Sequence, residues 1–177
     1  KALQEYATAQ AADDFKEVHP IFFWAHDHGI IHASRAVHTQ GDLQGLKLRF
    51  PTRLAGEALS ALGASPIGMP IPQVPEALAQ GVVDGCVIPW EVVPSLKINE
   101  FVEHHTEFPG SPTFYTATFV LAMNKARYEA LPPELKQVLD ANSGEAAAVM
   151  AGTAWDTGGA AAKQQAEEQG NEIYAMP

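Results

Sequence analysis

The strongest constraint on the fold is an alternation of short strands and helices between residues 46 and 88. Apolar and basic residues alternate over 46–50, the two-residue period of a half-buried strand, and Pro51 ends it. Thr52 can cap a following helix, and Gly63 stands where a left-handed helix end favours glycine. These residues therefore predict one strand–helix unit.

The same pattern repeats further along the chain. An apolar stretch at 66–71 precedes a helix at 74–79, Gly81 closes that helix, and an extended run follows at 82–88. Strands that alternate with helices form sheets with mainly parallel pairing, because the helices cross over the sheet faces. We therefore predict the α/β class with mainly parallel sheets.

Outside that region the sequence predicts further elements of both kinds. The helices are expected at 3–17, near 90–97 and over most of 132–169, and the strands at 21–25, 101–106, 115–123 and 171–176. Glycines at 144, 152, 158 and 159 are expected to bend the long helical region. The Pro/Gly-rich segment 107–112 is predicted to be a loop that crosses from one lobe of the protein to another.

Charge and composition exclude several kinds of partner. Lys and Arg number 11 against 21 Asp and Glu, so the surface field opposes binding to nucleic acid and to anionic lipid. No apolar run approaches the roughly 18 residues that span a bilayer. Cys86 is the one cysteine of the sequence, which excludes an internal disulfide and a cysteine-cluster metal site.

Arg49 is the most informative single residue. It stands at the carboxyl end of a predicted strand, directly before a helix, where open α/β sheets bind ligands. A guanidinium group can hold a carboxylate through two parallel hydrogen bonds. From position alone an ordinary surface salt bridge is the favoured interpretation, and it is the family resemblance described below that favours a ligand contact.

Four motifs give the chain a resemblance to a known family. They read DLQGLKLRFPT (42–52), LGASPIGMP (62–70), EALAQGVVDG (76–85) and LAMNKARYEALPPELKQVL (121–139). In order and spacing, over nearly the whole chain, they resemble the C4-dicarboxylate-binding-like solute-binding proteins of tripartite ATP-independent periplasmic (TRAP) transporters.

The resemblance implies an architecture and a ligand contact. Members have two α/β lobes joined by strands and by a long helix that spans both, and the motif arginine, here Arg49, pairs with the ligand's carboxylate. Residues 1–29 and 111–140 would belong to lobe I, and residues 30–110 and 141–177 to lobe II with the spanning helix. The N-terminal part of lobe I and further C-terminal helices are expected to be absent from the chain.

Two departures from the family pattern bear on the ligand. Ile88 and Trp90 flank Pro89 where many members carry an asparagine before the proline, so a polar contact becomes apolar. Gly29 stands near the place where sialic-acid-type members present a second arginine. We therefore expect a monocarboxylate with an aromatic or apolar body, and a C4-dicarboxylate or a 2-oxo acid remains an alternative.

Aromatic residues at predicted strand ends are candidates to line the crevice. Aromatic rings there would stack on a ligand body, although core packing is equally open for any one of them. We expect Trp24, Trp90 and Tyr115 to be the more exposed ones. The full set of predicted ligand-binding residues is Arg49, Trp24, Ile88, Trp90, Thr52, Phe114, Tyr115 and Arg35.

A histidine cluster supplies the rival hypothesis of a metal enzyme. His26 and His28 lie two residues apart with His32 close behind, but no cysteine or well-spaced carboxylate completes a site. The sequence also contains no phosphate-binding loop, no nucleophile elbow and no paired-histidine zinc helix. We expect no catalysis, no metal and no cofactor.

Together these features predict a periplasmic binding protein whose signal peptide has been removed. It would capture a small organic acid and deliver it to the membrane components of a TRAP transporter, with hinged lobes closing on the ligand. An extracytoplasmic sensor that binds the same ligand is the alternative.

Overall fold

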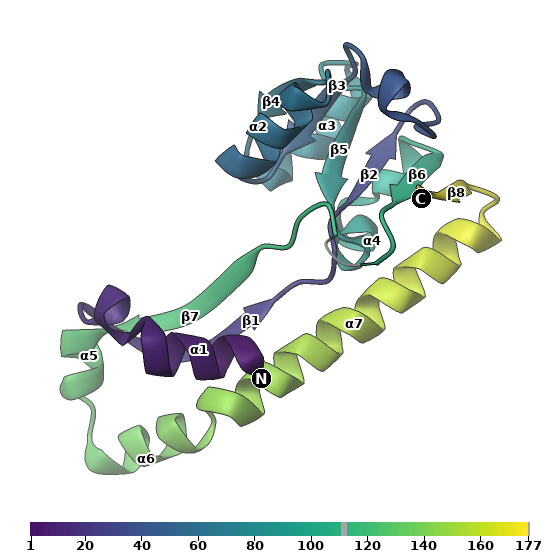
Figure 1. Ribbon diagram of the computed structural model, residues 1–177. Helices are drawn as coiled ribbons and strands as arrows, with labels where there is room; N and C mark the ends of the chain where they lie inside the picture. The colour runs from purple at the N-terminus through teal and green to yellow at the C-terminus, as the bar shows by residue number, and fades with distance from the viewer. Residues whose placement is uncertain (111–112, 177) are drawn as a thin grey trace. The chain divides into compact units, whose positions relative to one another are not determined.

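The computed structural model describes residues 1–110 and 113–176, and these form two compact units (Figure 1). Unit 1 comprises Lys1–His26 and Ala117–Asp156, and unit 2 comprises Asp27–Thr116 and Thr157–Pro177. The long helix α7, Gly144–Glu168, contributes residues to both. The predicted crossing segment 107–112 lies partly outside the described residues. The assignment of these units to the two lobes of a family member stays a prediction.

Unit 1 is built on a two-stranded antiparallel sheet of β1, Val18–Ala25, and β7, Thr118–Asn124. Its helices are α1 (Ala2–Gln10), η1 (Ala12–Phe15), α5 (Lys125–Glu129), α6 (Pro133–Ala141) and the first half of α7. The single helix predicted over 3–17 is therefore wrong in length, because Ala11 leaves helical geometry at φ −120° and a 3-10 turn follows.

Unit 2 contains a six-stranded sheet of order β4-β3-β5-β2-β6-β8. The strands are β2 (Ile30–Ala33), β3 (Lys47–Phe50), β4 (Ser65–Gly68), β5 (Gly85–Ile88), β6 (His104–Glu107) and β8 (Glu172–Ala175). β3 runs parallel to β4 and β5, and β6 runs parallel to β8, whereas β2 is antiparallel to β5 and to β6. The α/β class and the mostly parallel sheet are confirmed.

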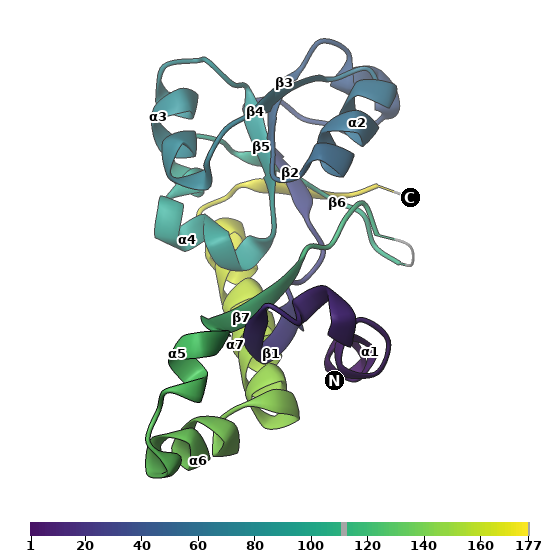
Figure 2. The ribbon, with the colours of Figure 1, turned by 90° about the vertical axis from the view of Figure 1, so that its left-hand side faces the viewer.

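Helices cover both faces of this sheet (Figure 2). Helix α2 (Arg53–Ala61) lies on one side, with α3 (Val74–Ala79) and α4 (Val93–Leu96) on the other. Short 3-10 turns η2 (Gln40–Leu43), η3 (Ile71–Gln73), η4 (Trp90–Val92) and η5 (Ile98–Glu100) complete the unit. Because strand residues alternate in direction, each face has its own buried core.

The connection from β3 to α2 forms as the sequence predicts. The Thr52 hydroxyl accepts a hydrogen bond from the backbone N of Ala55 at 3.3 Å, which caps the helix. Gly63 follows the helix with φ +96°, and a Cβ atom there would lie 1.9 Å from Nε2 of Gln44. The positive φ thus favours glycine at this turn, and a larger residue would also have to displace the end of the flexible Gln44 side chain.

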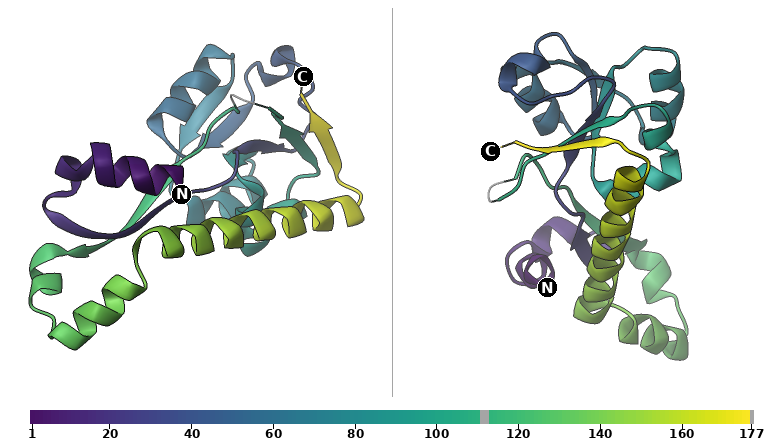
Figure 3. Two further views of the ribbon diagram at one scale, coloured as in Figure 1. Left: turned by 60° about the horizontal axis from the view of Figure 1, so that its bottom comes forward. Right: turned by 90° about the vertical axis from the view of Figure 1, so that its right-hand side faces the viewer.

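The long helical region divides at Gly144, whose φ of +71° separates α6 from α7. Glycines 152, 158 and 159 lie inside α7, which continues as α-helix through all three (Figure 3). The long helix expected from the family resemblance is confirmed. Among the helices of the described ranges, none has the length and apolar character needed to cross a membrane.

Candidate ligand-binding site

One row of residues crosses the sheet of unit 2 and includes the buried polar side chains of Arg49, His32 and His105. Arg49 on β3 is aligned with Cys86 on β5, Cys86 with His32 on β2, and His32 with His105 on β6. Side chains at aligned positions point to the same face of a sheet. Arg49 therefore shares a sheet face with Cys86 and both buried histidines.

Arg49 is buried although it carries a charge. Its residue is only 6% exposed, and its Nε donates a hydrogen bond to the backbone carbonyl of Met69 at 3.1 Å. Burial lowers the pKa of Arg49 from its usual value. Since arginine stays protonated in proteins even so, the site contains a permanent positive charge.

The guanidinium group is incompletely satisfied. Nη1 of Arg49 is buried and has no hydrogen-bond partner among the described residues, whose ion pairs also include none to Arg49. A buried donor without an acceptor costs about 1–3 kcal/mol, and more when it is charged. The group lacks a hydrogen-bond acceptor, and an anion such as a carboxylate would supply one and also compensate the charge.

The nearest titratable neighbours do not neutralise Arg49. Burial raises the pKa of the Cys86 thiol to about 12, and burial also raises the pKa of Tyr115, with the nearby Arg49 charge opposing both shifts. Both side chains are therefore neutral at physiological pH. An anion bound to Arg49 would meet no competing thiolate or phenolate.

Ile88 and Trp90 are buried rather than displayed. Ile88 is 1% exposed and pairs with Ile30 across the sheet. Trp90 is 4% exposed, and its indole N–H donates to Oε1 of Glu107 at 2.8 Å. The expectation that Trp90 is one of the more exposed aromatics is wrong, because that hydrogen bond and edge contact with the His32 ring hold it in the core. A ligand contact by either residue stays a prediction.

Thr52 and Arg35 use their polar atoms within the protein. The Thr52 hydroxyl caps α2, and Nη2 of the exposed Arg35 donates to the backbone carbonyl of Gln44 at 3.3 Å. Their predicted roles in ligand binding have no further support from these contacts.

Phe114 and Tyr115 lie together in unit 2. Phe114 stacks on Phe108 with ring centroids 5.1 Å apart, and its ring meets that of Tyr115 nearly at right angles, at 6.2 Å. Both are half-buried. Tyr115 lies close enough to Arg49 for the two to affect each other's pKa. A ligand contact by Phe114 or Tyr115 stays a prediction.

Trp24 lies on β1 in unit 1. It is half-buried and stacks on Phe119 of β7, with ring centroids 5.2 Å apart. Its indole nitrogen is buried and has no acceptor among the residues that the structure describes. Its predicted contact with a ligand stays a prediction.

The structure reveals a buried histidine pair that the sequence did not suggest. His32 and His105 oppose each other on antiparallel strands, and their Nδ1 atoms are 2.8 Å apart. Nε2 of His32 also lies 3.3 Å from the carbonyl oxygen of Ile88. Desolvation by burial lowers the pKa of both histidines. The signal was the pairing register of two strands, which local sequence patterns do not show.

The histidines of the rival metal hypothesis have separate partners. Nε2 of His26 accepts from the backbone N of Ala117 at 3.1 Å, and Nδ1 of His28 lies 2.8 Å from Oδ1 of Asp27. His32 is paired with His105. Within residues 1–110 and 113–176, no group of three or more His, Cys, Asp or Glu side chains is arranged to hold a metal ion.

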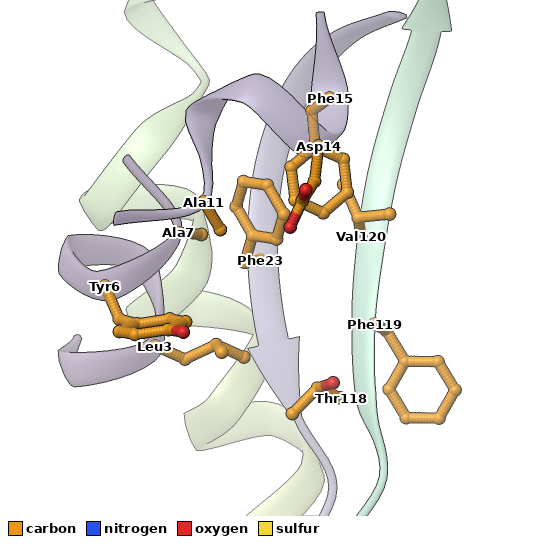
Figure 4. Close-up of a pocket in the computed structure, with 10 residues that line it drawn as sticks. All are labelled: Leu3, Tyr6, Ala7, Ala11, Asp14, Phe15, Phe23, Thr118, Phe119 and Val120. Carbon is orange, nitrogen blue, oxygen red and sulfur yellow. The ribbon is translucent and has the colours of Figure 1, made fainter. Parts of the chain in front are cut away.

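A separate cavity of about 230 Å³ lies in unit 1, against α1, η1 and the two strands (Figure 4). Its lining is mostly apolar and includes Phe15, Phe23 and Val120, with Asp14 as the one charged lining residue. An acidic group beside an apolar wall disfavours a carboxylate. This cavity therefore does not compete with Arg49 as a carboxylate site.

Comparison with known proteins identifies the family. The model of bacterial extracellular solute-binding proteins, family 7, matches residues 2–177, so the chain belongs to this family. The resemblance predicted from the four sequence motifs is confirmed.

Solved structures of similar proteins match the fold closely. A TRAP solute-binding protein from Rhodoferax ferrireducens, solved with copurified benzoate, is 45% identical with a TM-score of 0.93, over 99% of this chain and 55% of that one. A marine metagenome TRAP solute-binding protein specific for aromatic acid ligands, solved with 3-hydroxybenzoate, is 42% identical with a TM-score of 0.94, over the same shares.

A curated relative is more distant. The 2,3-diketo-L-gulonate-binding periplasmic protein YiaO of Escherichia coli is 31% identical over 146 residues, which cover 77% of this chain and 41% of the relative. The chain thus spans about half the length of the solved relatives, and less than half of this one.

Proposed function

We propose that the whole protein is a periplasmic solute-binding protein that captures a small organic carboxylate and delivers it to the membrane components of a TRAP transporter. Its role is binding, not catalysis. An aromatic or apolar monocarboxylate is the favoured ligand. A four-carbon dicarboxylate or 2-oxo acid ligand, or a sensor role, is the alternative.

The observation that carries the proposal is the buried, unsatisfied Nη1 of Arg49. The protein holds this positive charge at the carboxyl end of β3 with a hydrogen bond on Nε and leaves Nη1 without an acceptor among the described residues. A ligand carboxylate would supply the missing acceptor and compensate the charge. Family membership supports this interpretation, because the family consists of extracellular solute-binding proteins.

The preference for an aromatic body rests on two supports. The relatives at 42% and 45% identity were solved with 3-hydroxybenzoate and benzoate. In this chain the apolar Ile88 lies on β5 two residues after Cys86, the residue that is aligned with Arg49. Burying a ligand hydroxyl without a partner costs about 1–3 kcal/mol, so an apolar ligand contact at this position would disfavour polyhydroxylated acids.

The test is a calorimetric series on the full-length protein with benzoate, 3-hydroxybenzoate, a branched 2-oxo acid, succinate and glucuronate. We expect the tightest binding for an aromatic monocarboxylate. Tightest binding of glucuronate or succinate would contradict the favoured ligand class but leave the carboxylate site intact. No binding of any carboxylate would contradict the proposed function itself.

A further inference from the structure

The hydrogen bond that fixes the Arg49 side chain comes from the end of β4. Nε of Arg49 donates to the carbonyl oxygen of Met69 at 3.1 Å, and Met69 directly follows Gly68, the last residue of β4. Hydrogen bonds from N–H to oxygen are usually about 2.7–3.2 Å long, so this one lies near the upper end of that range. A shift of the Met69 carbonyl by a few tenths of an ångström would therefore weaken it.

Phe50, the residue after Arg49, is aligned with Gly68 across the parallel pair of β3 and β4. Successive residues of a strand point to opposite faces, so Phe50 lies on the sheet face away from Arg49. It packs against the buried cluster that contains Leu48. Cys86, which is aligned with Arg49, belongs to the other cluster. Phe50 therefore acts on the end of β4 from the side opposite the arginine.

The Phe50 ring lies against two glycines. A Cβ atom built on Gly68 would be 3.1 Å from Cζ of the ring, and one built on Gly56 of α2 would be 3.0 Å from Cε2 and 3.1 Å from Cδ2 and Cγ. Carbon atoms in ordinary contact are about 3.5–4.0 Å apart, so the ring fills the space over both glycines. Helix α2 thus limits how far the ring can retreat from the end of β4.

Other glycines of this unit show the contrast. Gly45 and Gly81 have φ of +70° and +67°, and a Cβ atom on either would meet nothing within 4 Å. Glycine at those two positions serves a turn. Gly56 and Gly68 have no positive φ, so their lack of a side chain provides space for the Phe50 ring and not backbone freedom.

We propose that Phe50 is a positioning residue for Arg49, because its ring holds the end of β4 and with it the Met69 carbonyl that fixes Nε of Arg49. With Nε held, the guanidinium keeps one orientation of Nη1, which has no hydrogen-bond partner among the described residues. A group that is already oriented loses less freedom when a ligand binds. The inference rests on the proposed function of Arg49 as the carboxylate-binding residue.

The first experiment needs no ligand and follows the Nε–H proton of Arg49 in the full-length protein by heteronuclear NMR. Its signal is assigned by its loss in Arg49→Lys. Exchange of this proton with water should be at least about fivefold faster in Phe50→Leu, because the Met69 carbonyl is no longer held. Gly68→Ala should also accelerate it, since the methyl group and the ring compete for one space. In the double variant Phe50→Leu/Gly68→Ala the rate should return to within about twofold of wild type, because the methyl group fills the space that leucine leaves.

Calorimetry with benzoate measures the consequence for binding. Phe50→Leu and Gly68→Ala should each weaken binding by about threefold to tenfold, the range expected for one lost hydrogen bond, and the double variant should recover. Val37→Ala is the matched control, because Val37 is 1% exposed in the same buried cluster but lies outside β3, α2 and β4. It should lower stability in urea denaturation and leave both the exchange rate and the affinity within about twofold.

If Gly68→Ala does not fold, recovery of a cooperative urea transition in the double variant supports the contact, and Phe50→Leu alone decides the exchange measurement. An unchanged exchange rate in Phe50→Leu, or an equal acceleration in Val37→Ala, overturns the inference and leaves the proposed function intact. Faster exchange with unchanged benzoate affinity also overturns it, because the Nε hydrogen bond would then not matter for binding. A wild type that binds no carboxylate contradicts the proposed function instead.

Discussion

Arg49 and His32 make an instructive comparison, because both are buried basic side chains in the same row of one sheet. Both nitrogens of the His32 ring have partners, at Nδ1 of His105 and at the carbonyl of Ile88. Arg49 has a partner at Nε, but Nη1 has none among the described residues. The polar groups of His32 are thus partnered within the protein, whereas Arg49 keeps an unpartnered donor, where we propose that a ligand carboxylate binds.

The difference distinguishes a buried polar group with a structural role from one that we propose to bind the ligand. His32 avoids the cost of burial by remaining neutral, since burial lowers its pKa well below the usual 6.5. Arginine cannot lose its proton at physiological pH, so the buried Arg49 keeps its charge. That charge is costly to the folded protein without ligand and stabilises a bound anion. Substitutions at the two positions should therefore have opposite effects on binding and on stability.

The largest expected effect is on binding, in Arg49→Ala. Affinity for the carboxylate ligand should fall by roughly 10- to 150-fold or more, because charge-assisted hydrogen bonds contribute about 1.5–3 kcal/mol. Arg49→Lys should recover little, since lysine lacks the planar fork. The free energy of unfolding without ligand should not fall, because an unsatisfied buried charge is removed. Calorimetry and urea denaturation measure the two effects.

Arg53 provides the matched control for Arg49. Its side chain is 93% exposed and forms an ion pair with Glu57 one helical turn away. Exposed pairs of this kind contribute at most a few tenths of a kcal/mol, so Arg53→Ala should leave ligand affinity within about twofold. Unchanged affinity in Arg49→Ala, or an equal loss in Arg53→Ala, would contradict the assignment.

The second effect is on stability and depends on pH. In the folded protein the pKa values of His32 and His105 are lowered below 6.5, so the unfolded chain binds more protons between those values and 6.5. Stability is therefore full above pH 6.5 and falls as the pH is lowered through this window, by up to about 1.4 kcal/mol per pH unit for each histidine.

Urea denaturation at several pH values down to 5 measures this dependence. The wild type is compared with the double variant His32→Leu/His105→Leu. The variant should show a flatter dependence between pH 6.5 and 5, because neither ring remains to be protonated. Glu172 is a separate contributor, since hydrogen bonds from His104 and His38 lower its pKa below 4.5 and its stabilisation is lost only below that value. Equal pH dependence in the two proteins would show that the histidine pair is not the cause.

The strand–helix segment that carries Arg49 was predicted well from the sequence, because the residues that determine it are neighbours in the chain. Strand alternation at 46–50, the Thr52 cap and the glycine at the helix end are all set by residues within one strand–helix unit. The helix at 74–79 was predicted with its correct bounds for the same reason. The choice of Arg49 as a candidate ligand-binding residue required only the rule that ligands bind beyond the carboxyl ends of strands in open α/β sheets.

Features that depend on strand register were missed. The His32–His105 pair joins residues 73 positions apart, and the close approach of the Tyr115 ring to Gly29 joins residues from two separate segments. The burial of Trp90 depends on Glu107 of a different strand. Local periodicity shows that these residues are apolar or aromatic, but not which side chain each one meets.

A smaller effect is expected at Glu107, which joins Trp90 to α7. Its Oε1 accepts from the Trp90 indole and its Oε2 lies 2.8 Å from Nζ of Lys163. Glu107→Ala should lower the free energy of unfolding by about 1–3 kcal/mol, because the buried indole N–H loses its acceptor. Ligand affinity should change little if Trp90 is a core residue. A loss of affinity as large as that of Arg49→Ala, without a loss of stability, would make Trp90 part of the ligand site after all.

The smallest expected effect is that of metal removal, for which we predict no change. The imidazole groups that a metal site would require are already engaged, His26 with a backbone amide, His28 with Asp27 and His32 with His105. Both ring nitrogens of His32 are engaged, so a metal ion bound to that ring would break its contact with His105 or with Ile88, whereas Arg49 needs no metal to hold a carboxylate. Prolonged treatment with a chelator should leave the calorimetric affinity for benzoate within about twofold of the untreated protein. Copurified zinc at one equivalent, together with loss of binding when it is removed, would place the histidines rather than Arg49 at the centre of the ligand site.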